Sequence, residues 1–542
     1  MSTPTRPVDP TPEPGSPAGA GSDKLDRATL MVAGVVVLGA IMSILDITVV
    51  SVAQQEFQRD FSATPAQTAW TMTGYTLALA TVIPLSGWAA DRFGTKRLYM
   101  LALVLFTAGS VLCAAADSVQ TLTAFRVVQG LGGGMLMPLG MTIMTRAAGP
   151  ERVGRVMAVL GVPMLLGPIF GPILGGWLID IASWHWIFLI NLPIGVAALV
   201  YAAVVLPPDR VSPSETFDFV GMLLLSPGLA LFLYGVSSIP EEGTVWAAKV
   251  LATAAVGLVL IVAFVLRTLL AAPEHPLMDL HLFRNRNLTV AVLAMSLFAI
   301  AFFGASLLFP QYFLLIRDET TLSAGLLLAP QGIGAMLTMP IAGVLTDKIG
   351  PGKIVMAGIG LIVVGMGMFT RVGVGAGAIS VDTSSAGAMV ATATEPSTLY
   401  LLAALFVMGL GMGGTMMPIM TSALASLADA EIARGSTLMN ITQQVAASIG
   451  TALFSVLLTN GFNRSAEAEA MRQSLEGDPS GLPQDPAQMG DFVASALAGM
   501  SQSFGDAFWV GTALVALCLV PAFFLPRRKI TREIDPALVA GH

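Results

Sequence analysis

One carboxylate and one guanidinium stand inside long apolar segments of this chain. Asp46 lies in the apolar stretch 28–53, and Arg126 lies in another at 121–145. A charge in a membrane-spanning helix costs about 2.5–3.5 kcal/mol on insertion scales, so such residues are functional candidates by default. A buried carboxylate that gains and loses a proton suggests proton-coupled transport. A purely structural ion pair is the alternative.

The two charges are expected at a similar depth in the membrane. Asp46 lies about seven residues from the outer end of its segment, which is roughly 10 Å at the helical rise per residue. Arg126 lies about five residues from the outer end of a segment that runs the opposite way, or roughly 8 Å. We therefore predict that Asp46 and Arg126 are partners in proton coupling.

The composition is that of an integral membrane protein. Hydrophobic residues make up 55% of the chain and charged residues 11%, whereas soluble domains carry about 25% charged residues. Segments of about 20 apolar residues can cross a bilayer. We predict fourteen such spans, at 29–53, 68–90, 98–116, 121–145, 156–179, 184–206, 218–239, 245–266, 288–315, 322–346, 354–372, 399–427, 436–460 and 506–526.

The basic residues indicate how these spans are oriented. With the N-terminus in the cytoplasm, twenty of the 27 Lys and Arg residues fall on the cytoplasmic side, six fall outside and Arg126 lies within a span. This positive-inside bias predicts that both termini are cytoplasmic. The net charge of −7 gives no sign of nucleic-acid binding, because the basic residues are scattered through short loops.

The two halves of the sequence resemble each other. Gly87-x-x-x-Asp91-Arg92-x-Gly94 follows the second span, and Gly343-x-x-x-Asp347-Lys348-x-Gly350 follows the tenth. This repeat predicts an all-α membrane protein of two six-helix bundles, at 29–206 and 288–526, with two inserted helices at 218–266. The rest is a disordered tail at 1–28, external loops at 373–398 and 461–505, and a cytoplasmic tail at 527–542.

The repeated loop has the residues of a cytoplasmic latch. Its glycines allow tight turns and close helix approach, and Asp91 can cap the next helix or pair with Arg92, Lys96 or Arg97. The predicted latch residues are Gly87, Asp91, Arg92, Gly94, Arg97, Asp347 and Lys348.

The fifth span combines glycines and prolines at regular spacing. Gly167, Gly171 and Gly175 recur every four residues and form a smooth face for close helix packing. Prolines interrupt the hydrogen-bond ladder and favour a bent or pliable helix. The predicted hinge residues are Gly161, Gly167, Pro168, Gly171, Pro172 and Gly175, and a generic packing face is the alternative.

These motifs resemble those of the major facilitator superfamily. The Gly87–Arg97 loop resembles its cytoplasmic signature, the fifth span its antiporter motif, and Arg126-x-x-Gln129-Gly130 its fourth-span motif. Leu45-Asp46-x-Thr48 in the first span resembles the signature of the fourteen-helix drug:proton antiporters of EmrB/QacA type. Ser51 replaces the Asn of that signature, and its proline is absent.

The resemblance implies the major facilitator fold and multidrug efflux. We expect a proton-coupled antiporter in a bacterial cell membrane that exports small hydrophobic or amphipathic compounds by alternating access and works as a monomer. Methionine-rich spans and scattered polar residues could form an adaptable cavity. The candidates for that cavity are Thr48, Trp70, Tyr75, Gln129, Met137, Gln331, Met416, Gln443 and Gln444.

Other functions remain open on the same sequence. An exporter of a lipid, a siderophore or a metabolite would share the fold, and a receptor or scaffold that no longer transports is an alternative of another class. No G-x-x-x-x-G-K-[ST] loop for ATP occurs. We expect no cofactor, no metal and no enzymatic activity, because no nucleophile–base arrangement or metal-ligand cluster is evident.

Overall fold

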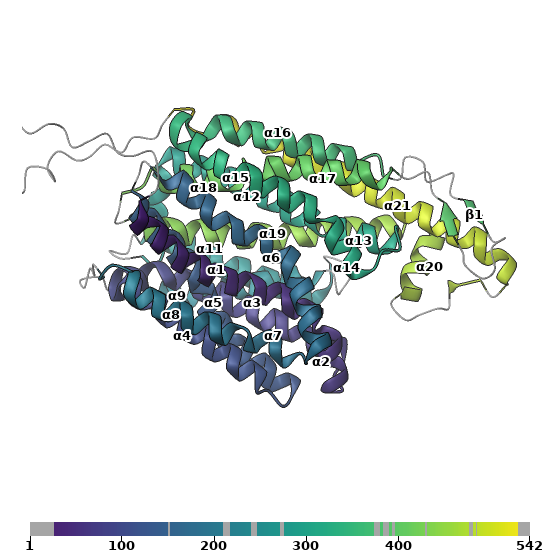
Figure 1. Ribbon diagram of the computed structural model, residues 1–542, viewed down its shortest axis with the longest axis horizontal. Helices are drawn as coiled ribbons and strands as arrows, with labels where there is room; N and C mark the ends of the chain where they lie inside the picture. Colours follow the sequence, from purple (N-terminus) through teal and green to yellow (C-terminus); the bar gives the residue numbers. More distant parts are fainter. Residues whose placement is uncertain are drawn as a thin grey trace, which may run out of the picture.

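The computed structural model describes residues 26–149, 152–209, 217–239, 246–271, 276–372, 380–382, 390–392, 396–428, 431–475, 481–483 and 485–528. Most of the predicted tails 1–28 and 527–542, and most of loop 373–398, lie outside these residues. The described chain is helical apart from two short strands. The helices run side by side along the long axis of the molecule (Figure 1).

The first half of the chain forms one helical bundle. Its helices are α1 (Arg27–Val52), α2 (Gln54–Asp60), α3 (Pro65–Phe93), α4 (Thr95–Ala114), α5 (Val119–Ala148), α6 (Val153–Ile181), α7 (His185–Leu189) and α8 (Asn191–Val205). Helix α5 packs against α3 and α4, while α1 packs against α6. The side chains of Thr64 and Ser118 accept hydrogen bonds from the first turns of α3 and α5, which sets where these helices begin.

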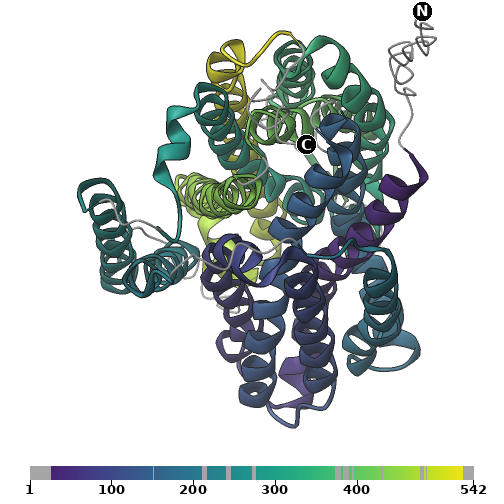
Figure 2. The ribbon, with the colours of Figure 1, turned by 90° about the vertical axis from the view of Figure 1, so that its left-hand side faces the viewer.

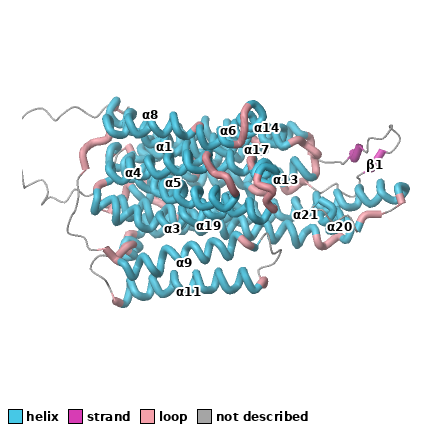
Figure 3. Tube along the Cα trace, turned by 90° about the horizontal axis from the view of Figure 1, so that it is seen from below, coloured by secondary structure: helices cyan, strands magenta, loops and turns pink. Residues whose placement is uncertain are grey.

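A pair of helices stands apart from the bundle. Helices α9 (Phe219–Ser237) and α11 (Ala248–Leu270) pack against each other. Figures 2 and 3 show them as a separate pair beside the bundle. Helix α9 also contacts α3 and α19 (Ile432–Phe462), so the pair covers the seam between the two halves. The 3-10 helix η1 (Leu280–Arg284) leads to the second half.

The second half forms a matching bundle. Besides α19 it comprises α12 (Arg286–Ser306), α13 (Leu308–Leu315), α14 (Thr321–Leu327), α15 (Ala329–Ile349), α16 (Pro351–Phe369), α17 (Thr398–Gly413), α18 (Met416–Leu424), α20 (Ala466–Leu475), α21 (Pro486–Leu517) and α22 (Leu519–Phe523). Strands β1 (Ser380–Asp382) and β2 (Val390–Thr392) pair antiparallel, with Ser380 opposite Thr392. Helix α12 packs on α19, and α17 packs on α15 and α16.

Twelve helices in the described residues are long and apolar enough to cross a membrane. Several of them combine two helical pieces, such as α12 with α13 and α17 with α18. Helices α3 and α6, with 29 residues each, are not among these twelve but belong to the bundle. The chain is therefore a multi-pass membrane protein, and the predicted count of fourteen spans is not established by these helices.

Helices occupy much of the segment 461–505, which was expected to be an external loop. Helix α21 begins at Pro486, about 20 residues before the predicted span at 506–526, and α20 packs against it. This segment is helical because its aromatic and apolar side chains have partners: Phe504 contacts the rings of Tyr312 and Phe462. Figure 1 shows α20 and the first part of α21 projecting beyond the rest of the bundle.

Both ends of the described chain lie at one end of the bundle, which we call the terminal side. Asp26 lies 3.8 Å from Arg152, and the neighbouring Gly154 N–H donates to Asp347 at 2.9 Å. Close by, the Gly352 N–H donates to the Pro526 carbonyl at 2.8 Å. The opposite end, from which α20 and α21 project, is the far side (Figure 1). The halves meet through α6 with α15 and through α19 with α3 and α5.

Candidate functional site

Asp46 and Arg126 form an ion pair inside the first half. Arg126 Nη1 donates to Asp46 Oδ2 at 2.5 Å, and both side chains are completely shielded from solvent. Helix α1 supplies the carboxylate and α5 supplies the guanidinium. The similar depth expected from the sequence therefore corresponds to direct contact. A buried pair of this kind is held by its geometry, because each charge would be very costly without the other.

Neutral polar side chains form further hydrogen bonds with the pair. Gln129 donates to Asp46 Oδ1 at 2.7 Å and accepts from Arg126 at 2.6 Å. Its amide also donates to Ser110 of α4 at 2.6 Å. Asn191 of α8 donates to Ser110 at 2.9 Å and lies 3.5 Å from Asp46 Oδ1. Four helices, α1, α4, α5 and α8, thus converge on one carboxylate.

Arg126 has further contacts that do not depend on Asp46. Its Nε donates to the Thr71 carbonyl at 3.1 Å, and its guanidinium lies 4.1 Å from the centre of the Tyr75 ring. Such a cation–π contact is worth about 2 kcal/mol when desolvated. The buried Nη2 atom has no hydrogen-bond partner among the described residues. Arg126 would therefore stay partly stabilised if Asp46 were neutral, with one donor left for a new partner.

An aromatic cluster separates the ion pair from the far side. Phe57, Trp184 and Phe188 are buried, and the rings of Phe57 and Trp184 meet edge to face at 5.2 Å. Phe188 also lies 5.8 Å from the Arg126 guanidinium. Both charged side chains are shielded from solvent in this arrangement.

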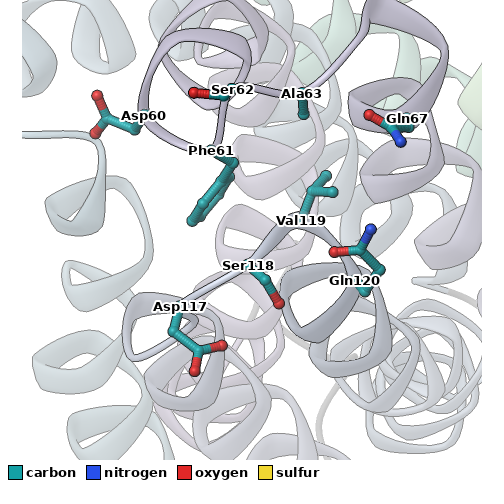
Figure 4. Close-up of a pocket in the computed structure, with 9 residues that line it drawn as sticks. All are labelled: Asp60, Phe61, Ser62, Ala63, Gln67, Asp117, Ser118, Val119 and Gln120. Atoms are coloured by element: carbon teal, nitrogen blue, oxygen red, sulfur yellow. The ribbon is translucent and has the colours of Figure 1, made fainter.

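A cavity of about 400 Å³ opens beyond this cluster (Figure 4). Asp60 and Asp117 line it, but both carboxylates already accept hydrogen bonds, from Trp184 at 2.8 Å and from Thr121 at 2.9 Å. Across the described residues, no group of three His, Cys, Asp or Glu side chains is placed to hold a metal ion. This cavity is a polar vestibule on the far side.

The predicted hinge residues of α6 face two different partners. A Cβ atom on Gly167, Gly171 or Gly175 would meet Ile44, Thr48 or Val49 of α1. Gly161 instead faces Met339 and Met417 of the second half. Pro168 and Pro172 lie within a helix that is unbroken from Val153 to Ile181. Helix α6 therefore packs tightly on α1 along one face and contacts the other half along another.

Replacing Gly171 with Ala should destabilise the α1–α6 contact. The new Cβ would overlap the Thr48 hydroxyl and lie 2.5 Å from Thr48 Cβ, and overpacking of this kind costs about 1–3 kcal/mol. We expect a lower melting temperature of the purified protein. Gly176→Ala is the matched control, because nothing lies within 4 Å of its Cβ position. Equal melting temperatures for the two variants would contradict the prediction.

Asp91 joins its helix both to a neighbouring helix and to the other half. It lies 3.7 Å from Arg146 of α5 and 3.5 Å from Arg434 of α19, which are not among the expected partners Arg92, Lys96 and Arg97. The first turn of α4 is capped by Asp209, which accepts from the Lys96 and Arg97 N–H groups at 2.7 and 3.1 Å. Arg97 also lies 3.9 Å from Asp209. The sequence could not indicate this because Asp209 is more than a hundred residues away.

The second copy of the latch also connects the two halves. Asp347 accepts hydrogen bonds from the Gly154 and Arg155 N–H groups at the start of α6 and lies 3.5 Å from the Arg155 Nε. Lys348 is exposed. Gly94 and Gly350, at corresponding turns, have φ angles of 96° and 87°, which only glycine adopts readily. Gly87 packs against Thr437 of α19.

Polar side chains also join the halves deeper in the protein. Ser86 lies 3.1 Å from Thr437, and Thr142 lies 2.8 Å from Ser436. Asn440 lies 3.2 Å from the Met141 sulfur. Together with both latches, these contacts close the terminal side between the two bundles.

The structure disperses the predicted cavity residues. Tyr75 and Gln129 belong to the buried ion-pair network, and Thr48 donates to the Gly167 carbonyl at 3.2 Å within the α1–α6 contact. Trp70 stacks on Tyr234 of α9 at 5.5 Å, outside the bundle interior. The sequence does not determine how each helix is rotated, so it could not indicate these four placements.

The remaining cavity candidates have mixed positions. Met416 is buried in α18, whereas Met137, Gln331 and Gln443 are half-buried. Gln444 lines a cavity of about 320 Å³ on the outside of α19. The assignment of these residues to a substrate cavity stays a prediction.

Comparisons with known proteins decide the family. Residues 36–451 match the profile of the Major Facilitator Superfamily. The chain belongs to this superfamily. It is 48% identical over 546 residues to a protein named Multidrug resistance protein B homolog from Mycobacterium tuberculosis H37Rv, covering 98% of this chain and 97% of that protein. It is 31% identical to the Multidrug export protein EmrB of Haemophilus influenzae, covering 78% and 79%.

Solved structures of the superfamily show the same fold. The human organic anion transporter MFSD10 (TETRAN) matches with a TM-score of 0.55 at 15% identity, covering 90% of this chain and 99% of that one. A proton:xylose symporter, XylE, matches with a TM-score of 0.56 at 15% identity, covering 94% and 99%. The predicted all-α major facilitator fold is confirmed.

Two side chains in the hydrogen-bond network of this major facilitator protein were not proposed as site residues from the sequence. Asn191 lies beside Asp46, and Ser110 accepts hydrogen bonds from Asn191 and Gln129. A serine in an apolar span is too common to attract notice. Asn191 is the better signal, because an amide is costly in an apolar span unless it is bonded.

Proposed function

We propose that this protein is a proton-coupled multidrug exporter that releases hydrophobic or amphipathic compounds by alternating access. The observation that carries the proposal is the buried Asp46–Arg126 pair, the kind of titratable intramembrane site that proton-driven transport requires. Relatives that are named multidrug resistance and multidrug export proteins support the choice of substrates. The superfamily consists of transporters, which argues against an enzyme.

We further propose fourteen membrane spans with both termini in the cytoplasm. Helices α3 and α6 pack inside the bundle beside α5 and α1, and each is long enough to cross a bilayer of about 30 Å. Adding them to the twelve apolar helices gives an even number of spans and two ends on the same side. The excess of Lys and Arg on that side supports a cytoplasmic location for both ends of the chain. We place the protein in a bacterial inner membrane.

In this proposal the latches close the cytoplasmic side, and the proton comes from outside. Protonation of Asp46 removes the charge that holds Arg126 Nη1, while Thr71, Gln129 and Tyr75 retain part of the guanidinium's stabilisation. The α1–α5 contact weakens, and the balance between the two access states shifts. Substrate binding to the deprotonated state completes the exchange. The pair lies within a single bundle, so one chain is expected to suffice.

The test is transport by the purified full-length protein in proteoliposomes with an imposed pH gradient. Chemically varied fluorescent compounds, cationic and neutral, are offered one at a time. We expect several of them to accumulate only when the gradient is present and in the direction opposite to proton flow. Accumulation that ignores the gradient for every compound would overturn proton coupling. Transport of a single lipid or metabolite alone would favour the specific exporter.

A further inference from the structure

A lateral cavity lies between the inserted helix pair and the second half. It has a volume of about 320 Å³ and is lined by α19, α12 and the last residues of α9. Gln444, Ser448 and Thr451 contribute hydroxyl and amide groups from α19, Ser306 and Phe303 come from α12, and Ser237 comes from α9. None of the described residues that line this cavity is charged. Its chemistry therefore suits a neutral molecule with a hydrogen-bonding group and an apolar body.

The cavity lies at the far end of α9, close to the end of α12 and beside the middle of α19, which continues to Phe462. Ser237, Phe303 and Ser448 are 16 to 18 positions from the first residues of their helices, which corresponds to about 24–27 Å of helical rise. Since the hydrocarbon core is about 30 Å thick, this depth lies near the far-side leaflet of the bilayer. Figures 2 and 3 show the inserted pair at the periphery of the bundle, where lipid would surround it.

A polar stripe on α19 connects this cavity with the centre of the protein. Ser436, Asn440, Gln444 and Ser448 are spaced four residues apart and so share one side of the helix. Ser436 bonds Thr142 and Asn440 contacts Met141, both on α5 of the first half. The stripe extends over about 18 Å from the contact between the halves to the lateral cavity. Amide groups in a membrane-spanning helix are costly unless they are bonded, so a stripe of this length points to a use.

The inserted pair is held at its terminal-side end by charged groups. At its far end it packs on Ala452 of α19 through apolar side chains and borders two cavities. Asp218 caps α9 through the Gly221 N–H at 2.8 Å, and Arg267 of α11 holds both of its oxygens at 2.8 and 2.9 Å. Burial raises the pKa of Asp218, but the hydrogen bonds from Arg267, Gly221 and Leu277 outweigh this and keep that pKa below its ordinary value. At the far end, a second hollow of about 100 Å³ lies on the α3 side of Ser237.

We propose that the lateral cavity is the exit through which neutral amphipathic substrates pass from the central pathway into the outer leaflet. The polar group of the substrate follows the hydroxyl and amide stripe of α19, while its apolar body faces Phe303 and the end of α9. The far end of α9 moves aside, while the contact between Asp218 and Arg267 holds the opposite end of this helix in place. This inference rests on the proposed export function and adds the substrate class and its route.

The first measurement is gradient-driven transport of a neutral, membrane-partitioning naphthylamine dye in proteoliposomes. Ser448→Trp fills the cavity and is expected to abolish transport of this dye. Leu453→Trp is the matched control on the same helix, because Leu453 is 38% exposed and does not line the cavity. If Ser448→Trp transports like Leu453→Trp, the exit is refuted while the export function stands. If the wild-type protein moves no compound against the gradient, the export function itself fails.

The second measurement does not depend on transport. A cysteine at 448 is labelled with a bilayer-soluble maleimide, against Ala446→Cys on the same helix, where the native side chain is buried. The native Cys113 and Cys518 are buried as well. We expect labelling at 448 to be about tenfold faster, because a buried thiol reacts only after local opening. We also expect the neutral dye to slow the labelling at 448. Equal rates at 448 and 446, or no protection by the dye, would overturn the proposal.

Discussion

Replacing Asp46 with Asn abolishes the response of transport to a pH gradient. Asparagine has the same shape, and its single carbonyl oxygen can still accept from Arg126, but the amide cannot release a proton. Thr71, Gln129 and Tyr75 retain part of the stabilisation of the guanidinium. Coupling between two bound ligands typically amounts to about 5- to 150-fold in affinity, and this factor should disappear. Substrate exchange without a gradient should persist, because that exchange needs no proton.

The measurement compares gradient-driven accumulation with substrate counterflow in the same proteoliposomes. Asp506→Asn is the control, because that carboxylate pairs with Arg464 on the far-side surface, where 55% of its side chain is exposed. It should behave like the wild type in both assays. Accumulation by Asp46→Asn at the wild-type rate would mean that Asp46 is not the coupling group and that the pair is structural.

Replacing Arg126 with Gln destabilises the whole first half. The substitution leaves the Asp46 carboxylate buried without its cation, and breaking one side of a buried pair costs about 3–5 kcal/mol. It also removes the hydrogen bond to the Thr71 carbonyl and the contact with the Tyr75 ring. We expect a clearly lower melting temperature in detergent and loss of transport.

The double variant Asp46→Asn with Arg126→Gln separates stability from coupling. Neutralising both partners removes the uncompensated charge, so most of the lost stability should return while gradient-driven transport stays absent. Arg59→Gln is the control at the surface, where exposed ion pairs contribute little, and it should change stability by no more than about 0.5 kcal/mol. A double variant as unstable as Arg126→Gln would show that the pair's charges are not what stabilises this site.

The ion pair could be predicted from the sequence because each charge stood alone in an apolar segment. The placement of Asp46 and Arg126 at similar depth needed only the helical rise and the direction of each span. The partners of Asp91 could not be predicted in this way. Three basic residues follow it within six positions, yet it pairs with Arg146 and with Arg434, more than 300 residues away.

Hydrophobicity, glycine spacing and the repeated loops determined, from the sequence alone, a membrane protein of two similar helical halves with a charged pair in the first. These are local properties of each segment, so no folded structure is needed to infer them. Only the tertiary structure decided which side of each helix faces the interior. It therefore placed Trp70 beside α9, drew Ser110 and Asn191 to Asp46, and aligned the α19 stripe with the lateral cavity. Helix rotation is set by packing between segments distant in the chain.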